Sequence, residues 1–480
     1  MKACVDQAPG RRYHASMFDS TVYSARRGAL VRALASRGQR EGRVLFLGNR
    51  ESPMNYADNC YSFRQDSSFL YFVGISLPGL AAAIDLASGA ATLYGDDATM
   101  DDIVWTGPQP AMSELAAAAG IEVSRSRSAL ARDLAPLSPR ASVLYLPPYR
   151  ADARAELSEL TGKPYAVVNA GASLPLIKAA IELREIKTAA EIAQMDRAVA
   201  VTVDMHNAAL ATARSGMLES DLYGRVAEVA LASGGGLSFP VIATTKGATL
   251  HRHSHDRALE AGGLFLLDAG AELPSGYAGD LSTTFPIGPR FDDRQKAVYE
   301  IVLRMHRKAC SMLRPGVSFR DVHFAAAREG VVGLKELGLM RGYPDEAVAS
   351  GAYAFFFPCG TGHMIGLDVH DMEDYGELHV GYEGLERSRL FGLKSLRLAK
   401  PLRSGMTFTV EPGIYFIPEL YAMWEAEGRF ADFIDYAAVK PWLDFGGMRN
   451  EEDWLVTESG ARMLGPAFDK SIEAIERSRA

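Results

Sequence analysis

A glycine-rich segment in the second half of the chain, FFFPCGTGHMIGLDVHD (355–371), holds three residues that can bind metals or move protons. These residues are Cys359, His363 and His370. Glycines at positions 360, 362 and 366 leave the backbone bare around His363, as in a loop that something must approach closely. The segment is therefore either a glycine-rich turn that contains histidines by chance or a site in which His363 is a ligand.

Carboxylates stand beside predicted strands elsewhere in the same half. The run GGLFLLDAGAELPSGYAGDLSTTFPIG is typical of a β-hairpin, in which Asp268 ends the first strand and Asp280 begins the second. Two like charges opposite each other in a hairpin repel, and a shared divalent cation would reverse that effect. For this hairpin alone, two solvated turn residues are an equally good interpretation.

Two further acids follow the same pattern. Glu411 comes directly after the apolar strand MTFTV, and Glu451 lies in the acidic loop before the strand WLVT. In isolation each is explained as a solvated acid where a sheet meets water. Together, four carboxylates and one imidazole form an oxygen-rich set that favours Mn²⁺, with Zn²⁺ or Co²⁺ as alternatives. Two of the carboxylates could bridge two ions about 3.5–4 Å apart, as in two-metal hydrolases.

Three more histidines lie in the run HRHSH, at positions 251, 253 and 255. On a strand they would share one face, an arrangement that can hold zinc. Partly exposed polar residues are the favoured interpretation for His253 and His255, and a separate zinc site is the alternative.

The elements that must position these residues form two groups. The first group predicts a compact α/β domain that ends near residue 180. It has a helix from Ser20 to about Ser36 capped by Asp19, strands in RVLFLG, SSFLYFVGI, GLAAAIDL, ATLYG and VLYLPP, and a helix in DARAELSELTG. The second group begins with a charged helical segment and includes long helices over Asp292–Leu313 and Phe319–Leu337. The expected domains are residues 18–180 and 185–470.

Composition excludes several classes of function. The net charge of −8 argues against non-specific nucleic-acid binding, and no run of about 18 apolar residues predicts a membrane span. The four cysteines are scattered without CxxC spacing, which argues against a disulfide framework and indicates a reduced, cytoplasmic setting. Residues 1–16 have no signal-peptide layout and are interpreted as a leader before the folded part.

Four segments, DAGAE…YAGDLSTTFP, GTGHMIGLDVHD, TVEPGIYF and GGMRNEED, resemble the signature segments of the Xaa-Pro aminopeptidases (aminopeptidase P). YSFRQDSSFLYFVGI and DDIVWTGP also resemble the smaller N-terminal domain of that family, so the resemblance covers about residues 18–465. It implies an α/β (α+β) architecture, with a creatinase/aminopeptidase P-type N-terminal domain before a pita-bread metallopeptidase domain. It also implies two divalent metal ions, peptide substrates with proline at the second position, and a homo-oligomer, dimer or tetramer.

The resemblance assigns a role to each candidate residue. Asp268 would chelate one metal, Asp280 and Glu451 would bridge both, and His363 and Glu411 would bind the second. The residues implied to serve the substrate or the reaction are His251, His370, Arg449 and Trp105, together with Glu411 as the proton acceptor. A metal-bridging hydroxide would then attack the carbonyl carbon of the first residue, and the proline nitrogen would leave.

Cys359 is the departure from the family pattern that bears most on the site. At the position of Cys359, relatives usually carry a histidine that lines the substrate site, and a thiol cannot be a cationic donor near neutral pH. A tolerated substitution is favoured over an altered preference or a lowered rate, because all five expected ligands remain.

Three alternatives stay open. A prolidase, which cleaves Xaa-Pro dipeptides, shares all five ligands and would differ in the groups that cap a free carboxylate. A binding protein that has lost catalysis is supported only by Cys359. A creatinase-like amidinohydrolase lacks the metal set, so the intact carboxylates argue against it.

Overall fold

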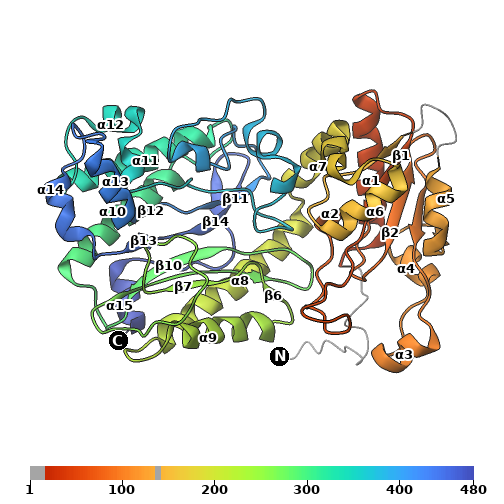
Figure 1. Cartoon of the computed structure of the whole chain (residues 1–480), viewed down its shortest axis with the longest axis horizontal. Coiled ribbons are helices and arrows are strands. Elements are labelled where there is room, and N and C mark those ends of the chain that lie inside the picture. Colours follow the sequence, from red (N-terminus) through yellow and green to blue (C-terminus); the bar gives the residue numbers. More distant parts are fainter. Residues whose placement is uncertain (1–16, 136–141, 480) are drawn as a thin grey trace. The chain divides into compact units, whose positions relative to one another are not determined.

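The computed structural model describes residues 17–135 and 142–479, so Cys4 and the predicted leader (1–16) lie outside the described residues. The chain divides into two compact units, Met1–Arg184 and Glu185–Ala480 (Figure 1). No described helix is long and apolar enough to cross a membrane.

The N-terminal unit is built on a five-stranded mixed sheet with strand order β4-β3-β2-β1-β5. Its strands are β1 (Arg43–Leu47), β2 (Ala81–Asp85), β3 (Ala91–Tyr94), β4 (Val123–Arg125) and β5 (Val143–Leu144). Its helices are α1 (Ser20–Ser36), α2 (Ser67–Phe72), α3 (Met100–Thr106), α4 (Met112–Ala118), α5 (Leu130–Leu134), α6 (Ala151–Thr161) and most of α7 (Leu174–Glu185). The four predicted strands in RVLFLG, GLAAAIDL, ATLYG and VLYLPP are confirmed, as are the helices α1 and α6.

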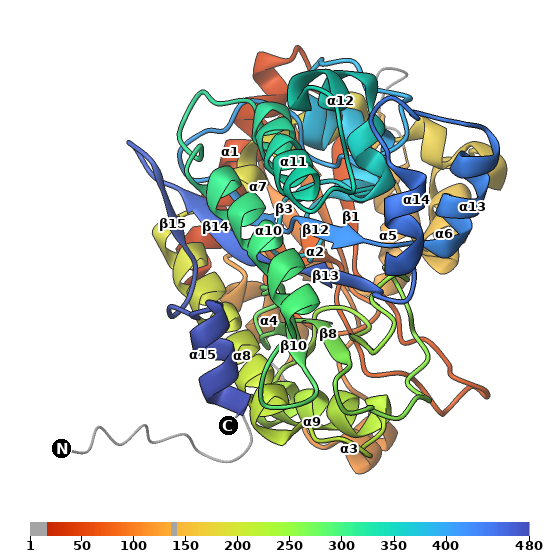
Figure 2. The same cartoon turned by 90° about the vertical axis from the view of Figure 1, so that its left-hand side faces the viewer.

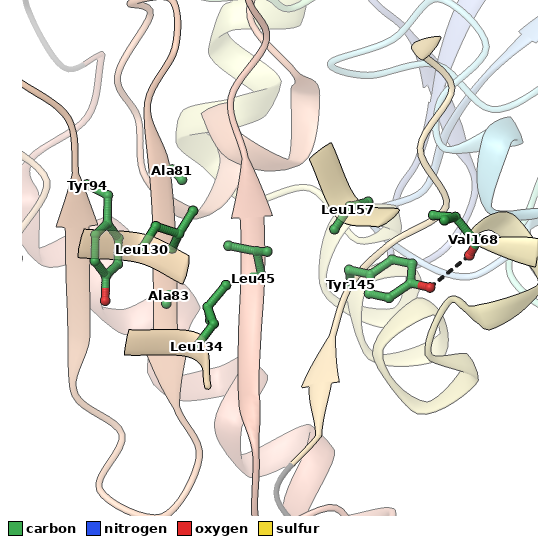
Figure 3. Packing of buried hydrophobic residues seen from close by; sticks show 9 residues of the cluster. All are labelled: Leu45, Ala81, Ala83, Tyr94, Leu130, Leu134, Tyr145, Leu157 and Val168. Carbon is green, nitrogen blue, oxygen red and sulfur yellow. Dashed lines mark hydrogen bonds between the residues drawn. The ribbon is translucent and has the colours of Figure 1, made fainter. Parts of the chain in front are cut away.

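A core of aliphatic and aromatic side chains covers one face of this sheet (Figure 3). Leu45 of β1 and Ala83 of β2 are register partners, and Leu130 and Leu134 of α5 pack over them. Tyr145 is buried with this cluster, and its hydroxyl donates a hydrogen bond of 2.8 Å to the carbonyl of Val168. The unit therefore has a hydrophobic core of its own.

The predicted strand in SSFLYFVGI is wrong, because Ser67–Phe72 forms the helix α2. The side chain of Asp66 accepts a hydrogen bond of 2.8 Å from the amide of Phe69 and so caps the first turn. All but one of the helix's residues are buried. A short segment that is apolar on every side gives no periodicity by which a helix can be told from a strand.

The C-terminal unit holds three small sheets with the strand orders β10-β8-β7, β11-β14-β15 and β12-β13, and a two-stranded ribbon of β6 and β9. Its strands are β6 (Gly236–Leu237), β7 (Ile242–Thr244), β8 (Leu264–Ala269), β9 (Ala271–Glu272), β10 (Leu281–Pro286), β11 (Thr407–Val410), β12 (Gly413–Tyr415), β13 (Gly447–Arg449), β14 (Glu452–Val456) and β15 (Ala461–Met463). Its helices are α8 (Ala189–Thr212), α9 (Glu219–Ala232), α10 (Asp293–Cys310), α11 (Phe319–Glu336), α12 (Pro344–Ser350), α13 (Pro418–Ala426), α14 (Tyr436–Val439) and α15 (Ile472–Arg479).

Helices flank these sheets in two pairs. The helices α8 and α9 pack together against β7, β8 and β10, whereas α10 and α11 pack together and α10 contacts β11, β12 and β13 (Figure 2). Asp292 caps α10 by accepting a hydrogen bond of 2.7 Å from the amide of Gln295. The two long helices predicted from the sequence are confirmed.

Candidate metal centre

The β8–β10 hairpin supplies two of the candidate ligands. The predicted hairpin is confirmed, and in its antiparallel register Asp268 faces Ser282, so Asp280, just before β10, does not lie directly opposite Asp268. The backbone amide of Asp280 instead donates a hydrogen bond of 2.9 Å to Asp453 Oδ2. Both candidate aspartates are buried, with 8% of Asp268 and 4% of Asp280 exposed.

The backbone of His363 is hydrogen-bonded to β11, and the neighbouring residue Met364 orients its ring. Its amide donates to Thr409 Oγ1 over 3.2 Å, and its Nδ1 lies 3.1 Å from the carbonyl oxygen of Met364. Nε2 is therefore the ring nitrogen that faces the site, 3.5 Å from Asp280 Oδ2 and 3.8 Å from Glu411 Oε1. A Cβ atom on Gly362 would lie 2.0 Å from the Thr409 carbonyl oxygen, so this glycine serves the close packing of the loop on β11.

Glu451 joins this group from the turn between β13 and β14. Ser282 Oγ donates a hydrogen bond of 2.7 Å to Glu451 Oε2, and the Glu451 amide donates one of 3.1 Å to the Ser282 carbonyl. One ligand atom from each of Asp280, His363 and Glu451 lies within 4.8 Å of the others, and all three side chains are buried. Residues far apart in the chain thus converge on one point.

This donor set fits divalent cations. Asp280 Oδ1 is buried and has no hydrogen-bond partner among the described residues. Buried polar atoms are nearly always satisfied, so an unpaired carboxylate oxygen beside an imidazole nitrogen and a second carboxylate is suited to bind a cation. The chemistry of the donors, oxygen-rich with a single nitrogen, suits Mn²⁺ or Zn²⁺.

Electrostatics support the same conclusion. Burial raises the pKa of Asp280 well above its ordinary value, and the charges of Glu451, Asp268 and Asp453 raise that pKa further. Burial likewise raises the pKa of Glu411, with Glu451 as the next cause. Burial alone would lower the pKa of His363, but the carboxylates of Glu411 and Glu451 outweigh it and raise that pKa. Repulsion of this kind is relieved when a cation binds between the carboxylates.

Arg449 anchors the side of the site nearest Asp268. Its guanidinium forms an ion pair with Asp268 Oδ2 and donates hydrogen bonds to Ser282 Oγ over 2.9 Å and to the Tyr415 hydroxyl over 2.9 Å. Arg449 is 3% exposed, so these contacts fix its position. It therefore holds Asp268 in place through a buried, charge-assisted contact.

His370 lies at the edge of the same group. Its ring stacks on that of His363, with centroids 3.8 Å apart and an interplanar angle of 15°, and its side chain is 40% exposed. Nδ1 lies 2.8 Å from Glu373 Oε1, and Glu373 Oε2 lies 3.3 Å from a guanidinium nitrogen of Arg397. Burial lowers the pKa of His370, and the charge of His363 adds to that effect.

The remaining candidates differ in their surroundings. Residues 251–255 form neither a helix nor a strand, so the strand arrangement considered for the HRHSH run is wrong. Burial lowers the pKa of His251, and the charge of Arg449 lowers it further, whereas the charge of Asp268 raises it. The influence of these two site residues indicates that His251 lies beside the site. His255 instead stacks on Tyr223. Trp105 lies on α3 of the N-terminal unit and is 85% exposed, and its proposed role stays a prediction.

Cys359 is partly buried beside the site. Burial raises the pKa of its thiol to about 12, the charge of Glu411 adds to this, and Arg449 and a hydrogen bond with Tyr415 oppose it. The group is therefore a neutral thiol at working pH, which is a weak donor and a poor metal ligand.

We expect Cys359→Ala to leave the affinity for Mn²⁺ unchanged and to alter kcat/KM by less than about tenfold, because only one weak neutral hydrogen bond is lost. Calorimetric titration and steady-state kinetics on an Xaa-Pro peptide measure both quantities, with Cys359→Ser as the conservative control. One such hydrogen bond cannot account for a loss of activity beyond about 100-fold. A loss of that size in both variants would therefore show that the thiol takes part in catalysis.

Several residues that build the site were not identified from the sequence. They are Ser282, Asp453, Tyr415 and Thr409, each of which contacts a candidate ligand or Arg449. The available signal was weak: polar residues stand in otherwise apolar strands, as in LSTTFP and TFTV. A buried polar side chain needs a partner, but the partner cannot be named without the tertiary structure.

Two family models match the chain. The model described as "Metallopeptidase family M24" matches residues 193–458, and that described as "Aminopeptidase P, N-terminal domain" matches residues 23–145. Among curated relatives, human Xaa-Pro dipeptidase is 31% identical over 448 residues, which are 91% of this chain and 88% of the relative. A probable Xaa-Pro aminopeptidase of Fusarium vanettenii is 30% identical over 441 residues, 90% of this chain and 91% of the relative.

Solved structures show the same likeness over the full length. The aminopeptidase PepP of Pseudomonas aeruginosa superposes with a TM-score of 0.79 at 26% identity, covering 96% of this chain and 98% of that one. Proline aminopeptidase P II of Yersinia pestis superposes with a TM-score of 0.78 at 27% identity, covering 96% of this chain and 99% of that one.

Proposed function

Because the chain belongs to metallopeptidase family M24, we propose that it hydrolyses the peptide bond between an N-terminal residue and a following proline. The observation that carries this proposal is the buried group of Asp280, His363 and Glu451, in which one carboxylate oxygen has no hydrogen-bond partner in the described part of the chain. The relatives named for Xaa-Pro cleavage support the choice of substrate.

The proposed ligands are Asp268, Asp280, His363, Glu411 and Glu451. Two divalent ions, with Mn²⁺ favoured by the oxygen-rich set, are the proposed cofactors. When bound, such ions lower the pKa of a water molecule and polarise the scissile carbonyl. Four carboxylates that repel one another in the metal-free protein supply the negative charge that two divalent ions need.

The chain's own residues then move the protons. Glu411 Oε1 lies 3.8 Å from His363 Nε2, and the Glu411 carboxylate is the group that we propose accepts the proton of the attacking water. The proline nitrogen is a tertiary amide without its own proton, so it must receive one on leaving, and Glu411 can pass that proton on. His370 and His251, whose pKa values are lowered by burial, are neutral donors or acceptors beside the carbonyl oxygen.

Substrate length separates an Xaa-Pro aminopeptidase, our first candidate, from an Xaa-Pro dipeptidase. A dipeptidase must bind the free carboxylate of the proline, and Arg397 is our candidate for that contact. Its guanidinium is 42% exposed, adjoins Glu373 beside His370, and its positive charge is felt by both His370 and His251. This observation favours the second candidate, and planar recognition of a carboxylate is a common use of arginine.

Product analysis tests both candidates at once. The Mn²⁺-loaded protein is given an Xaa-Pro dipeptide and the same sequence extended by one residue, and the products are followed by mass spectrometry. Release of the first residue from either peptide supports the proposed bond specificity, and the ratio of the two rates assigns the substrate length. If neither peptide is cleaved while metal is demonstrably bound, the proposed function is wrong.

The homo-oligomer expected from the sequence stays part of the proposal. The described unit that carries Trp105 presents further exposed apolar side chains on the same helix, Met100 and Val104. Light scattering on the purified protein measures the oligomeric state, and Trp105→Ala tests whether this helix contributes to it.

A further inference from the structure

Lys470 is a buried cation that neither the sequence motifs nor the proposed ligand set includes. It precedes α15, is 6% exposed, and has its backbone fixed by a hydrogen bond of 2.9 Å from the Tyr299 hydroxyl to its carbonyl oxygen. Its Nζ donates hydrogen bonds to two carbonyl oxygens, those of Ser282 and Glu451. A lysine this deeply buried is unusual unless its charge is compensated nearby.

Both contacts of Lys470 converge on the proposed ligand Glu451. The carbonyl of Ser282 also accepts the Glu451 amide, and Ser282 Oγ donates to the Glu451 carboxylate. Ser282 in turn lies two residues after Asp280 on the strand β10. The ammonium of Lys470 thus ties together the two backbone segments that present the carboxylates of Asp280 and Glu451.

The charges around Lys470 are mostly negative. Burial lowers its pKa, and the carboxylates of Glu452, Glu451 and Asp453 oppose that shift. Asp453 is itself buried, and its carboxylate accepts a hydrogen bond from the backbone amide of Asp280. Among the described residues two buried cations hydrogen-bond to this cluster; Arg449 is paired with Asp268, which leaves Lys470 as the cation beside the backbone of Glu451.

We propose that Lys470 is the resident counter-charge of the metal-free site: it holds the repelling carboxylates together until divalent ions bind. This inference rests on the metal site of the proposed function. Its consequence is a coupling between Lys470 and the metal, because each relieves the same repulsion and the loss of one makes the other more important. A lysine that merely anchored α15 would contribute equally with and without metal.

Thermal unfolding with and without metal tests this coupling. Lys470→Met and Lys470→Gln are compared with the wild type in EDTA and in saturating Mn²⁺, with Lys470→Arg as the control that keeps the charge. We expect both neutral variants to lose more in Tm without metal than with it, so that Mn²⁺ raises their Tm by about 5 °C more than it raises that of the wild type. Lys470→Arg should behave as the wild type does.

Two other results are informative. An equal loss of Tm in both conditions, or a larger loss with Mn²⁺, overturns the counter-charge role while the metal site stands. If Mn²⁺ does not raise the Tm of the wild type itself, the metal site of the proposed function fails, and this inference with it.

Because Lys470→Gln keeps a donor for the two carbonyls, it remains informative if Lys470→Met does not fold without metal. Calorimetric titration of the folded, metal-free variants with Mn²⁺ should give binding at least as tight as in the wild type.

Discussion

Asp280→Asn is expected to abolish metal-dependent hydrolysis and, at the same time, to raise the Tm of the metal-free protein. Activity should fall by more than about 100-fold, since even groups that only support ligands contribute 10–100-fold. The Tm should rise because Asp280 is buried, has an unpaired oxygen and is repelled by Glu451 and Asp268. A neutral amide removes that repulsion, and each kcal/mol gained corresponds to about 2–4 °C for a unit of this size. Unfolding in EDTA and kinetics in Mn²⁺ measure the two effects.

The pH dependence of this gain follows from the raised pKa of Asp280. A carboxyl group whose pKa is higher in the folded state retains a proton that the unfolded chain has lost, so stability falls as pH rises. Below about pH 4, the ordinary value for aspartate, both states are protonated and the variant should gain little. The Tm advantage should therefore grow as the pH is raised above about 4, and it should level off once the pH exceeds the raised pKa of the buried carboxyl.

The exposed residue Asp432 offers a matched control for this prediction. Asp432→Asn removes the same charge from the chain without touching the site, so neither the activity nor the metal-free Tm should change appreciably. A lower Tm for metal-free Asp280→Asn than for the wild type would show that the carboxylate is stabilised in the empty site, contrary to the repulsion inferred here.

Arg397→Ala is expected to lower kcat/KM selectively for the Xaa-Pro dipeptide. If Arg397 binds the free carboxylate of the proline, its loss removes a charge-assisted hydrogen bond of about 1.5–3 kcal/mol, or about 10–150-fold in kcat/KM. The loss should be confined to the Xaa-Pro dipeptide, because a longer peptide carries its carboxylate elsewhere. We expect kcat/KM for the tripeptide to change by less than about threefold, the usual range for surface substitutions.

Arg387 provides the matched control for Arg397. Both arginines pair with Glu377, and their side chains are 41% and 42% exposed, and the charge of Arg397 is among the causes that lower the pKa of His370 and of His251. Arg387→Ala should therefore leave both substrates nearly unaffected. Replacing the carboxylate of the dipeptide by an amide should lower kcat/KM of the wild type by the same factor as Arg397→Ala does. Combining the amide substrate with Arg397→Ala should cause no further loss.

An equal loss for dipeptide and tripeptide in Arg397→Ala would contradict the carboxylate role. It would instead indicate that Arg397 acts through Glu373, which it contacts beside the ring of His370. In that case Glu373→Gln should reproduce the effect on both substrates, and the aminopeptidase candidate would gain support.

The sequence determined the family and the kinds of groups in the site. The family and the two-part architecture expected from the four motifs are confirmed. This was possible because each motif is local: Asp268 follows the apolar run of a strand, a glycine loop carries His363, and Glu411 follows an apolar strand. Residue type and the neighbouring turn or strand are properties that a short stretch of sequence carries by itself.

Local patterns failed where burial or backbone path decided the outcome. Ser67–Phe72 is a helix because Asp66 caps it and the protein surrounds it, although its residues favour a strand. Asp268 faces Ser282 rather than Asp280, because register depends on where the hairpin strands begin to pair. The histidines at 251 to 255 share no strand, since that segment forms neither a strand nor a helix.

Only the tertiary structure decided which groups meet. Ser282 contacts Glu451 across 169 residues, Asp453 contacts Asp280 across 173, and Lys470 reaches the carbonyl of Ser282 across 188. Such contacts leave no periodic trace in the sequence, because a buried polar group needs some partner but does not specify where in the chain that partner lies. The sequence therefore determined the chemistry of the proposed ligands, and the fold determined their spacing, the unpaired oxygen of Asp280 among the described residues and the position of Lys470 beside Glu451.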